Sequence, residues 1–358
     1  MRKKILAALT AGLITLGTFG IGDAATRDEI AAINVKTAAD FQYWNDDSPT
    51  LQKLVAFVED VTNPISANYI PPEDRIATFD MDGTFYCETA PIYFQESMLM
   101  HRVLEDENYQ PPKKLYNLVK KVQPKILNKQ KLTPAENKAY FEGLTPAYAG
   151  MTIEEYRAYV RNFMNTNELG FTNLKRGEAF YLPMVEIISY LTNNDFNVYL
   201  DTACGVDTTR ELVKDIIPIR FDRILASDFN FTSTGMGKDI PKDHFFDRNK
   251  EKIVISGKPI IENGKTAKIF SIINQIGKKP VLAFGNSSGD SGMLEYTLQD
   301  NKYRSMSFFV ICDDTERELG NPKRAASDTA LALKRGWNPI SMRDEFKTIY
   351  GDNVKIAQ

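Results

Sequence analysis

Cysteine and histidine are scarce in this 358-residue sequence. The three cysteines, Cys87, Cys204 and Cys312, are too few and too scattered for a disulfide scaffold or a zinc site. The two histidines, His101 and His244, lie too far apart in their motif context to form a catalytic pair, so we expect structural or surface roles for both. The stability of the fold must therefore come from a hydrophobic core.

An excess of charge of one sign is also missing. The chain has 44 Lys and Arg residues against 47 Asp and Glu, a formal net charge of −3, and no dense basic run follows the first four residues. Such a run would be the electrostatic footprint of a nucleic-acid or anionic-membrane partner. Hydrophobic residues make up 43% of the chain, which is enough to bury a large core. The composition favours a soluble domain that acts on small molecules.

The N-terminus has the pattern of a secretory signal peptide. Arg2, Lys3 and Lys4 precede an apolar stretch over residues 5–22, and Gly22-Asp23-Ala24 supplies small residues for cleavage after Ala24. An uncleaved membrane anchor is the alternative, but four glycines and three threonines within residues 5–22 make a poor anchor. We therefore expect residues 1–24 to be removed and the protein to be periplasmic or secreted, with no membrane contact afterwards.

Short apolar runs alternate with helical periods in the rest of the chain, as in an α/β fold with a mostly parallel sheet. Strands are predicted at residues 75–81, 196–202, 280–285 and 305–312, with a weaker fifth at 223–227. Helices are predicted at residues 182–191, 206–216, 266–276 and 325–333. Residues 26–74 are expected to form helices that pack on the outside of this core.

Two long segments interrupt the alternation. Residues 91–180 carry no convincing strand but helical periods at 91–103, 112–122, 133–142 and 152–164, the last opened by a Thr152/Glu155 capping box. A crossover needs only about a dozen residues, so we expect an inserted helical module over the sheet. Residues 230–261 suggest an excursion with a β-hairpin formed by 252–256 and 259–261. The predicted division is 1–24, 25–90, 91–180 and 181–358.

The most informative motif follows the first predicted strand. Asp80 and Asp82 are two residues apart, so in extended backbone they share a face at the carboxyl end of the strand, where open α/β sheets bind ligands. Gly83 allows the chain to turn out of the sheet. Two carboxylates this close indicate a bound cation or a shared proton. A polar turn that merely closes the strand is the alternative for this motif taken alone.

Complementary groups follow the other predicted strands. Thr202 and Ala203 end the second strand, ahead of a helix whose first amides could hold an anion. Lys265 opens another helix, an unusual place for a cation unless an anion is bound there. Asn286 and Asp290 lie in one loop and offer oxygen ligands that suit a hard cation.

Taken in order, D-x-D-G-T, strand plus Thr, G-K and G-N-S-x-G-D resemble the four signatures of the haloacid dehalogenase (HAD) superfamily. The helical segment is similar to the cap of its phosphoserine and phosphorylcholine phosphatase-like branch, and residues 43–47 and 71–78 resemble exported bacterial members of that branch. The resemblance implies a Rossmann-like HAD core with a helical cap inserted after the first motif. It also implies a phosphatase, because an Asp at the position of Asp82 is typical of phosphate-ester chemistry in this superfamily.

The resemblance assigns roles to individual residues. Asp80 is the expected nucleophile, which would form an aspartyl-phosphate, and Asp82 the expected general acid and base. Phosphate binding is expected from Thr84, Thr202, Ala203 and Lys265, with Lys268 as the second candidate for the lysine. Mg²⁺ is the expected cofactor, held by Asp80, Asp82, Asn286 and Asp290. Many relatives have Asp where this chain has Asn286, so whether Asn286 or Asp290 binds the metal directly stays open.

The substrate is less well defined by the sequence. Glu88 lies close to the position of a cap-side Glu in phosphoserine phosphatases and could meet a cationic group, as in phosphorylcholine or phosphoserine. A solvated acid near the cap is the alternative for Glu88. Aromatic residues nearby could contact a quaternary ammonium group but are more typical of a core: Phe85, Tyr86, Tyr93 and Phe94. A phosphotransferase or phosphomutase and a non-catalytic binder of phosphorylated ligands remain alternative functions.

Overall fold

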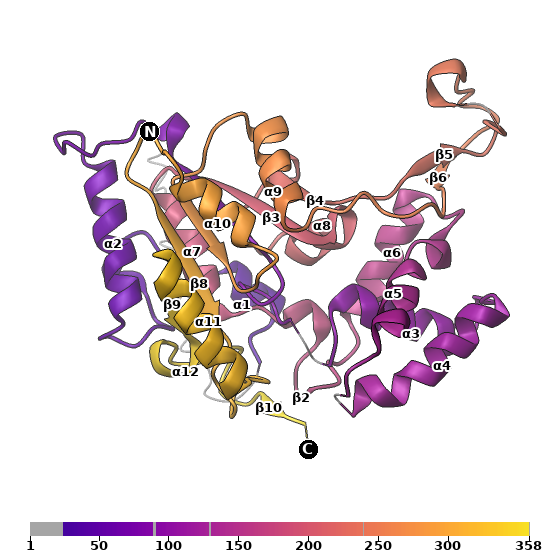
Figure 1. The fold of residues 1–358 in the computed structure, drawn as a ribbon, viewed down its shortest axis with the longest axis horizontal. Coiled ribbons are helices and arrows are strands. Elements are labelled where there is room, and N and C mark those ends of the chain that lie inside the picture. The colour runs from indigo at the N-terminus through magenta and orange to yellow at the C-terminus, as the bar shows by residue number, and fades with distance from the viewer. Residues whose placement is uncertain (1–23, 89–90, 129, 239, 358) are drawn as a thin grey trace, which may run out of the picture.

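A six-stranded parallel sheet forms the centre of the protein, which confirms the predicted α/β class (Figure 1). The computed structural model describes residues 24–88, 91–128, 130–238 and 240–357. The strand order is β4-β3-β1-β7-β8-β9, and each described neighbouring pair is parallel. The strands are β1 (Ile76–Phe79), β3 (Asn197–Gly205), β4 (Ile224–Ser227), β7 (Leu282–Gly285), β8 (Met306–Ile311) and β9 (Asn338–Ser341).

The sheet places the sequence motifs at one edge. Every residue of β1 is buried, as expected for an inner strand covered on both faces. Phe79 of β1 stacks on Phe284 of β7 with ring centroids 4.1 Å apart, and Phe284 stacks on Phe308 of β8 at 4.8 Å. Because β1, β3 and β7 are parallel neighbours, the residues that follow them converge at the carboxyl edge of the sheet.

The edge strand β9 was not predicted, whereas the weak fifth strand is present as β4. Pro339 within β9 lacks the N–H that a central strand would need, so its sequence does not have the pattern of a strand. At the sheet edge this missing donor is tolerated, and β9 pairs with β8 alone.

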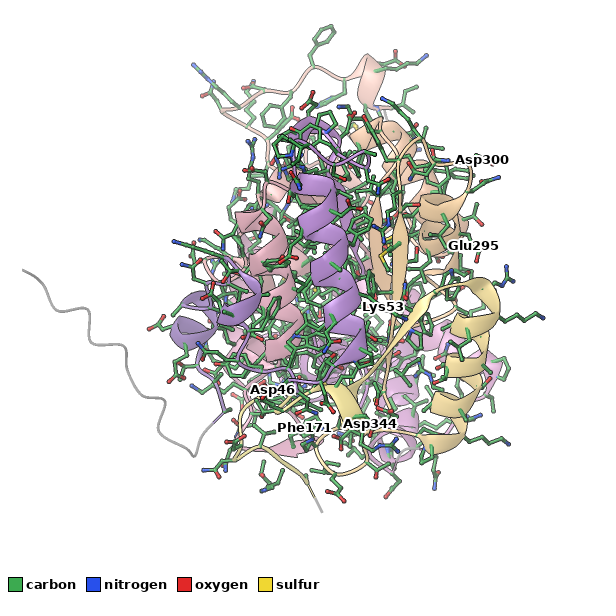
Figure 2. All side chains as sticks on the ribbon, turned by 90° about the vertical axis from the view of Figure 1, so that its left-hand side faces the viewer. Asp46, Lys53, Phe171, Glu295, Asp300 and Asp344 are labelled. Atoms are coloured by element: carbon green, nitrogen blue, oxygen red, sulfur yellow. The ribbon has the colours of Figure 1, made fainter. Side chains whose placement is uncertain are left out.

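Helices cover both faces of the sheet. Figure 2 shows α2, which carries Lys53, on the outside of the molecule, as expected for residues 26–74. The predicted helix 206–216 ends earlier, at Val213, and the predicted helix 266–276 is α-helical only to Ser271, followed by a π-helical turn over Ile272–Ile276. The flanking helices are α1 (Arg27–Ala31), α2 (Pro49–Thr62), α7 (Leu182–Asn193), α8 (Val206–Val213), α9 (Thr266–Ser271), α10 (Ser291–Leu298), α11 (Pro322–Arg335) and α12 (Met342–Glu345).

The long segment between β1 and β3 is helical. It contains α3 (Phe94–Leu104), α4 (Lys113–Leu127), α5 (Pro134–Glu142) and α6 (Ile153–Met164), which we call the cap helices. They gather on one side of the sheet (Figure 1). The Thr152/Glu155 capping box is present at the start of α6. Helix α4 is longer than predicted because it continues through Pro124.

The hairpin predicted from residues 252–256 and 259–261 is wrong in its pairing. Strand β6 (Ile253–Ile255) pairs antiparallel with β5 (Phe231–Ser233), far earlier in the chain. After β6 the chain turns at Gly257, whose φ is +74°, and Ile261 forms a bridge to Asp228 instead. This arm extends away from the sheet in Figure 1. A second small ladder joins β2 (Phe171–Thr172) and β10 (Lys355–Ile356).

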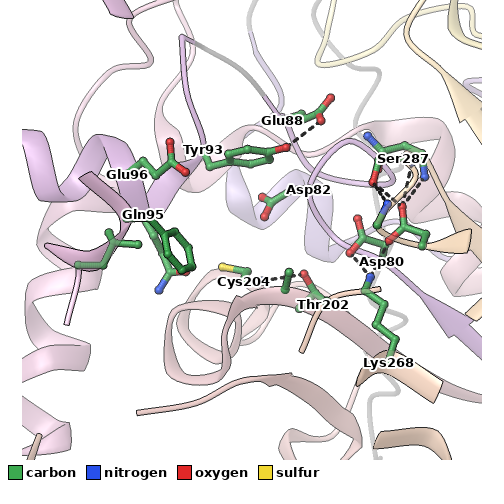
Figure 3. Close-up of a pocket in the computed structure, with 17 residues that line it drawn as sticks. Asp80, Asp82, Glu88, Tyr93, Gln95, Glu96, Thr202, Cys204, Lys268 and Ser287 are labelled. Atoms are coloured by element: carbon green, nitrogen blue, oxygen red, sulfur yellow. Dashed lines mark hydrogen bonds and ion pairs between the residues drawn. The ribbon is translucent and has the colours of Figure 1, made fainter. Parts of the chain in front are cut away.

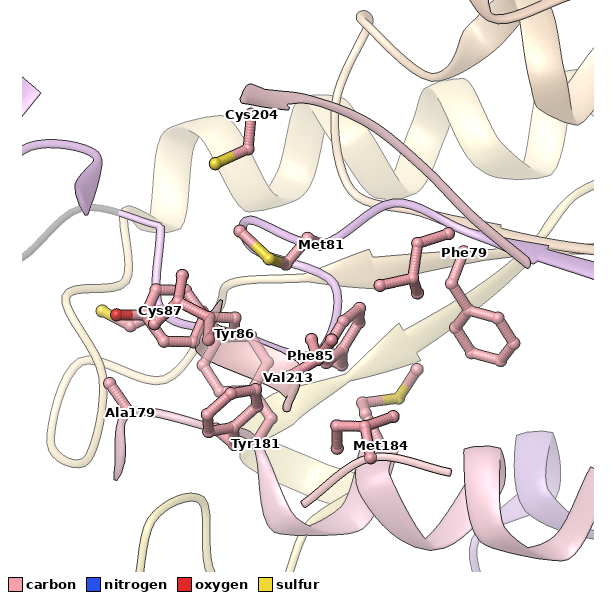
Figure 4. Close-up of a cluster of buried hydrophobic side chains, with 14 of the residues drawn as sticks. Phe79, Met81, Phe85, Tyr86, Cys87, Ala179, Tyr181, Met184, Cys204 and Val213 are labelled. Carbon is pink, nitrogen blue, oxygen red and sulfur yellow. The ribbon is translucent and has the colours of Figure 1, made fainter. Parts of the chain in front are cut away.

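Two of the cysteines lie in the hydrophobic core. Cys87 and Cys204 are buried, and no disulfide joins them or Cys312. Figure 4 shows the two buried thiols at separate places of one apolar cluster around Met81. The predicted signal peptide lies outside the described residues except for Ala24. Within the described ranges, no helix is long and apolar enough to cross a bilayer.

Candidate active site

A cavity of about 240 Å³ lies where β1, β3 and β7 end, between the sheet edge and the cap helices (Figure 3). Its sheet side carries residues of all the sequence motifs, and its cap side carries residues of α3 and α5. The sheet side of the lining includes Asp80, Asp82, Thr202, Ala203, Lys268, Asn286 and Asp290. The cap side includes Glu88, Tyr93, Gln95, Glu96, Phe141 and Leu144.

Asp80 and Asp82 follow β1 directly, as the sequence predicts, and both line the cavity. The backbone N–H of Asp80 donates to the carbonyl of Phe284 at 2.9 Å, so the strand pairing continues up to the first carboxylate. Gly83 then turns the chain with φ of +79°. A Cβ at Gly83 would lie only 1.9 Å from Nδ2 of Asn286, so both the backbone angle and the approach of Asn286 require glycine.

Lys268 of α9 is the lysine that reaches the carboxylates. Its Nζ donates to Oδ1 of Asp80 and to Oδ1 of Asp290, each at 2.7 Å. The side chain of Lys268 is only 1% exposed. A buried cation held between two carboxylates fixes both of them and offsets their charge.

Of the two candidate lysines, Lys268 lines the cavity and Lys265 does not. Lys265 is exposed and does not line the cavity. It is the N-cap residue of α9, with φ of +56°, and its backbone N–H donates to the carbonyl of Gly289 at 2.9 Å. Its backbone thus sets the start of the helix that carries Lys268.

Burial shifts the protonation of this group of side chains. Burial, together with the charge of Asp290, raises the pKa of Asp80 to about 7, although Lys268 opposes the shift. Burial also raises the pKa of Asp82 well above its ordinary value. For Lys268, burial disfavours the ammonium form, but the charges of Asp290 and Asp80 outweigh it and raise the pKa. The site is thus rich in carboxylates that gain from a bound cation.

The loop after β7 is organised by Asp290. Oδ2 of Asp290 accepts hydrogen bonds from the backbone N–H groups of Asn286 and Ser287, at 3.0 and 2.9 Å, while Oδ1 accepts from Lys268. Both oxygens of Asp290 are therefore engaged. Asn286 lines the cavity with its side chain against Gly83.

The donor set fits a hard cation such as Mg²⁺. Asp80 uses one oxygen for Lys268 and the amide of Asn286 supplies a neutral oxygen, while Oδ1 of Asp82, buried with no hydrogen-bond partner among the described residues, adds to the negative charge that a cation would offset. In the part of the chain that the structure describes, no three His, Cys, Asp or Glu side chains are already grouped as a metal site. Asn286 is thus the better candidate for a direct ligand, and Asp290 for the residue that positions it.

Of the four expected phosphate-binding residues, two line the cavity, whereas Lys265 and Thr84 do not. Thr202 and Ala203 lie on its wall. The Thr202 Oγ1 accepts a hydrogen bond from the Cys204 N–H at 3.2 Å, which leaves the hydroxyl hydrogen for an anion. Thr84 is fully buried, does not line the cavity, and its hydroxyl has no hydrogen-bond partner. Thr84 therefore packs in the core and does not form part of the cavity wall.

Glu88 lines the cavity but its charge is already compensated. Two nitrogens of the Arg324 guanidinium, on α11, lie 3.3 and 3.4 Å from its carboxylate oxygens, and the Tyr93 hydroxyl donates to it at 3.1 Å. Of the four aromatic residues near it in sequence, Phe85, Tyr86 and Phe94 are buried and only Tyr93 reaches the cavity.

Glu96, which the sequence analysis did not single out, is the cap-side carboxylate without a partner. Among the described residues, no side chain or backbone N–H donates to its carboxylate, although its backbone carbonyl accepts from the Tyr140 hydroxyl at 2.7 Å. Burial alone raises the pKa of Glu96 to about 7. Its place within the predicted helix 91–103 gave no sign of which way the side chain points.

Comparisons with known proteins give similarities of fold. Neither protein-family models nor curated proteins match the chain. A functionally unknown protein from Anaerococcus prevotii is 14% identical with a TM-score of 0.49, over 84% of this chain and 92% of that one. A cytosolic 5'-nucleotidase IIIB bound to cytidine is 10% identical with a TM-score of 0.44, over 83% and 88%.

A phosphoserine phosphohydrolase-like protein from Francisella tularensis is 12% identical with a TM-score of 0.35, over 72% of this chain and 99% of that one. Solved structures similar to this chain thus include one named as a nucleotidase and one named as a phosphoserine phosphohydrolase-like protein.

Proposed function

We propose that the protein is an exported, Mg²⁺-dependent phosphomonoesterase that acts through an aspartyl-phosphate on Asp80. The observation that carries the proposal is the convergence of Asp80, Asp82 and Lys268 in a small cavity at the carboxyl edge of the sheet, with Lys268 Nζ 2.7 Å from Asp80. Export is inferred from the signal-peptide pattern of residues 1–24. A cavity of about 240 Å³ suits a small phosphate ester.

The side chains support two successive displacements at phosphorus. In the first, a carboxylate oxygen of Asp80 forms a bond to phosphorus, the ester P–O bond breaks, and Asp82 gives its proton to the leaving alcohol. In the second, Asp82 takes a proton from water, the water oxygen bonds to phosphorus, and the acyl phosphate bond breaks to release phosphate. Because its pKa is raised by burial, Asp82 can begin the cycle protonated.

Mg²⁺, when bound, would neutralise charge on the transferring phosphoryl group. Asp80, the backbone carbonyl of Asp82 and Asn286 would hold it, while Asp290 keeps Asn286 in place through the loop amide. Lys268 and Thr202 would bind phosphate oxygens from the other side.

The cap side of the cavity favours an ester whose organic part carries an ammonium group, such as phosphorylcholine or phosphoserine. Among the described residues, no side chain pairs with the Glu96 carboxylate, and a partly buried carboxylate without a partner gains from a nearby cation. Tyr93 and Phe141 add aromatic surface to the same wall. Glu88, the carboxylate expected from the sequence, is a weaker candidate because Arg324 already compensates it.

Phosphate release by the protein without residues 1–24 tests the catalytic proposal. We expect release from a generic aryl phosphate that requires Mg²⁺ and is lost in Asp80→Asn. A folded protein that binds Mg²⁺ but releases no phosphate from a broad panel of phosphomonoesters would contradict it.

The substrate class is tested by Glu96→Gln, with Glu88→Gln as the matched control. We expect Glu96→Gln to raise KM for phosphorylcholine about 10–100-fold, which corresponds to about 1.4–2.8 kcal/mol of lost charge attraction, while KM for the aryl phosphate stays within about twofold. Glu88→Gln should change the ratio of the two KM values far less. Equal effects of the two substitutions on that ratio would refute the role of Glu96.

A further inference from the structure

Gln95 is a cap side chain that reaches the expected phosphate-binding stretch of the core. This residue lies in the first turn of α3 and lines the cavity next to Glu96. Its Oε1 accepts a hydrogen bond from the backbone N–H of Gly205 at 2.8 Å, at the end of residues 202–205, the irregular last part of β3, which we call the phosphate-binding loop. Figure 3 shows Gln95 approaching from the cap side, across from Thr202 and Cys204.

Strand pairing does not hold this loop by itself. The pairing of β3 with β4 is regular up to Thr202 and resumes only at Gly205, so Ala203 and Cys204 form an irregularity between them. The N–H of Cys204 is used by the Thr202 hydroxyl. The N–H of Gly205, which ends the irregular stretch, is fixed from outside the core by Gln95.

The fit between Gln95 and Gly205 is close and polar on both sides. A Cβ at position 205 would lie 2.5 Å from Nε2 of Gln95. Any residue other than glycine at position 205 would therefore displace the Gln95 side-chain amide from its observed place. Nε2 also donates to Oγ1 of Thr208 at 3.2 Å and to the hydroxyl of Tyr156 at 3.4 Å. Tyr156 and Thr208 are themselves 2.8 Å apart, so the amide belongs to a network that joins α3, α6 and α8.

A second cap contact on α8 lies further from the loop. Arg161 of α6 forms an ion pair with Glu211 of α8 at 2.8 Å, and Arg161 is 49% exposed. Glu211 has Arg157 at 3.9 Å as a second partner. Arg161 therefore helps to attach the cap to α8 without touching the loop, which makes it a matched control for Gln95.

We propose that Gln95 is a positioning residue: through the Gly205 N–H it sets the phosphate-binding loop, so that the loop is correctly placed only when the cap helix α3 is seated against the core. This inference rests on the proposed function, because the loop is assigned to phosphate. It assigns to the cap a part in phosphate binding as well as in recognition of the organic group.

Gln95→Leu keeps the branched end of the side chain one bond closer to the backbone and removes all three side-chain hydrogen bonds of Gln95. We expect it to weaken binding of inorganic phosphate about tenfold and to lower kcat by a similar factor, the worth of one or two hydrogen bonds. Arg161→Met should leave both within about twofold. Since inorganic phosphate has no organic part, its weaker binding cannot come from lost contacts with a leaving group.

Hydrogen exchange separates positioning from direct contact with phosphate. In the phosphate-free protein, amide exchange in residues 203–208 should be faster in Gln95→Leu, unchanged in Arg161→Met, and largely restored in Gln95→Glu, which keeps an acceptor for the Gly205 N–H. Weaker phosphate binding without faster exchange would mean direct contact and would overturn the proposal. So would equal behaviour of Gln95→Leu and Arg161→Met.

Failure of the proposed function and failure of the inference on Gln95 give different experimental results. If the wild-type protein releases no phosphate from any ester, the phosphatase proposal fails, while calorimetric titration with inorganic phosphate still decides the role of Gln95. If wild type and Gln95→Leu hydrolyse esters and bind phosphate equally well, the function stands and the inference on Gln95 is refuted.

Discussion

Replacement of Lys268 by methionine, beside the same change at Lys265, tests how the site is assembled. The two lysines are three residues apart at the start of α9, but Lys268 is buried between Asp80 and Asp290 at 2.7 Å from each, whereas Lys265 is exposed. Removing one partner of a buried ion pair destabilises a protein by about 3–5 kcal/mol, because the remaining charge is left uncompensated. We expect a lower unfolding midpoint for Lys268→Met and almost no change for Lys265→Met.

The same pair of variants separates the lysines by activity. Loss of a preorganised donor at the transferring group lowers kcat by about 10²–10³-fold. Phosphate release from an aryl ester, measured on folded protein well below the unfolding midpoint, should therefore fall by that factor in Lys268→Met and stay within about threefold of wild type in Lys265→Met. A strong loss of phosphate release in Lys265→Met, with activity retained in Lys268→Met, would refute the assignment of Lys268 to the site.

Two further predictions concern backbone fit and protonation. Gly83→Ala should lower kcat at least about 100-fold and reduce the free energy of unfolding by about 1–3 kcal/mol, because φ is +79° and the new Cβ would collide with Asn286. Wild-type activity and an unchanged melting temperature in this variant would contradict the role given to Gly83. Burial raises the pKa of Glu186 to about 8, so wild type should lose stability relative to Glu186→Gln as pH rises from about 4.5 to 8, by at most about 5 kcal/mol. Thermal unfolding of both proteins from pH 5 to 8.5 checks the sign, and a constant difference would refute it.

The parts of the site that adjoin apolar strands could be predicted from the sequence. Asp80 and Asp82 follow a strand that is buried throughout, and Asn286 and Asp290 follow another, so the parallel sheet alone brings them together. In contrast, the choice between Lys265 and Lys268 depends on the direction in which α9 leaves its loop. That direction is set by the left-handed backbone of Lys265, which no periodicity reveals.

The cap wall could not be predicted because its residues come from distant segments. Arg324 of α11 reaches Glu88 across 236 positions of sequence and compensates its charge, a pairing that local sequence does not reveal. Gln95 and Glu96 are adjacent in sequence, yet the first is fixed to the core and the second has an unpaired carboxylate. Strand β9 was overlooked for a local reason, since Pro339 is tolerated only at the edge of a sheet.

Detection of the phosphoryl-enzyme is the most direct test of the central claim. The wild-type protein would be mixed with excess aryl phosphate and Mg²⁺, quenched in acid during turnover, digested and examined by mass spectrometry. We expect a phosphoryl group on the peptide that contains Asp80, and none in Asp80→Asn. Turnover by wild type with no phosphoryl group on that peptide, or sustained turnover by Asp80→Asn, would contradict the proposed mechanism.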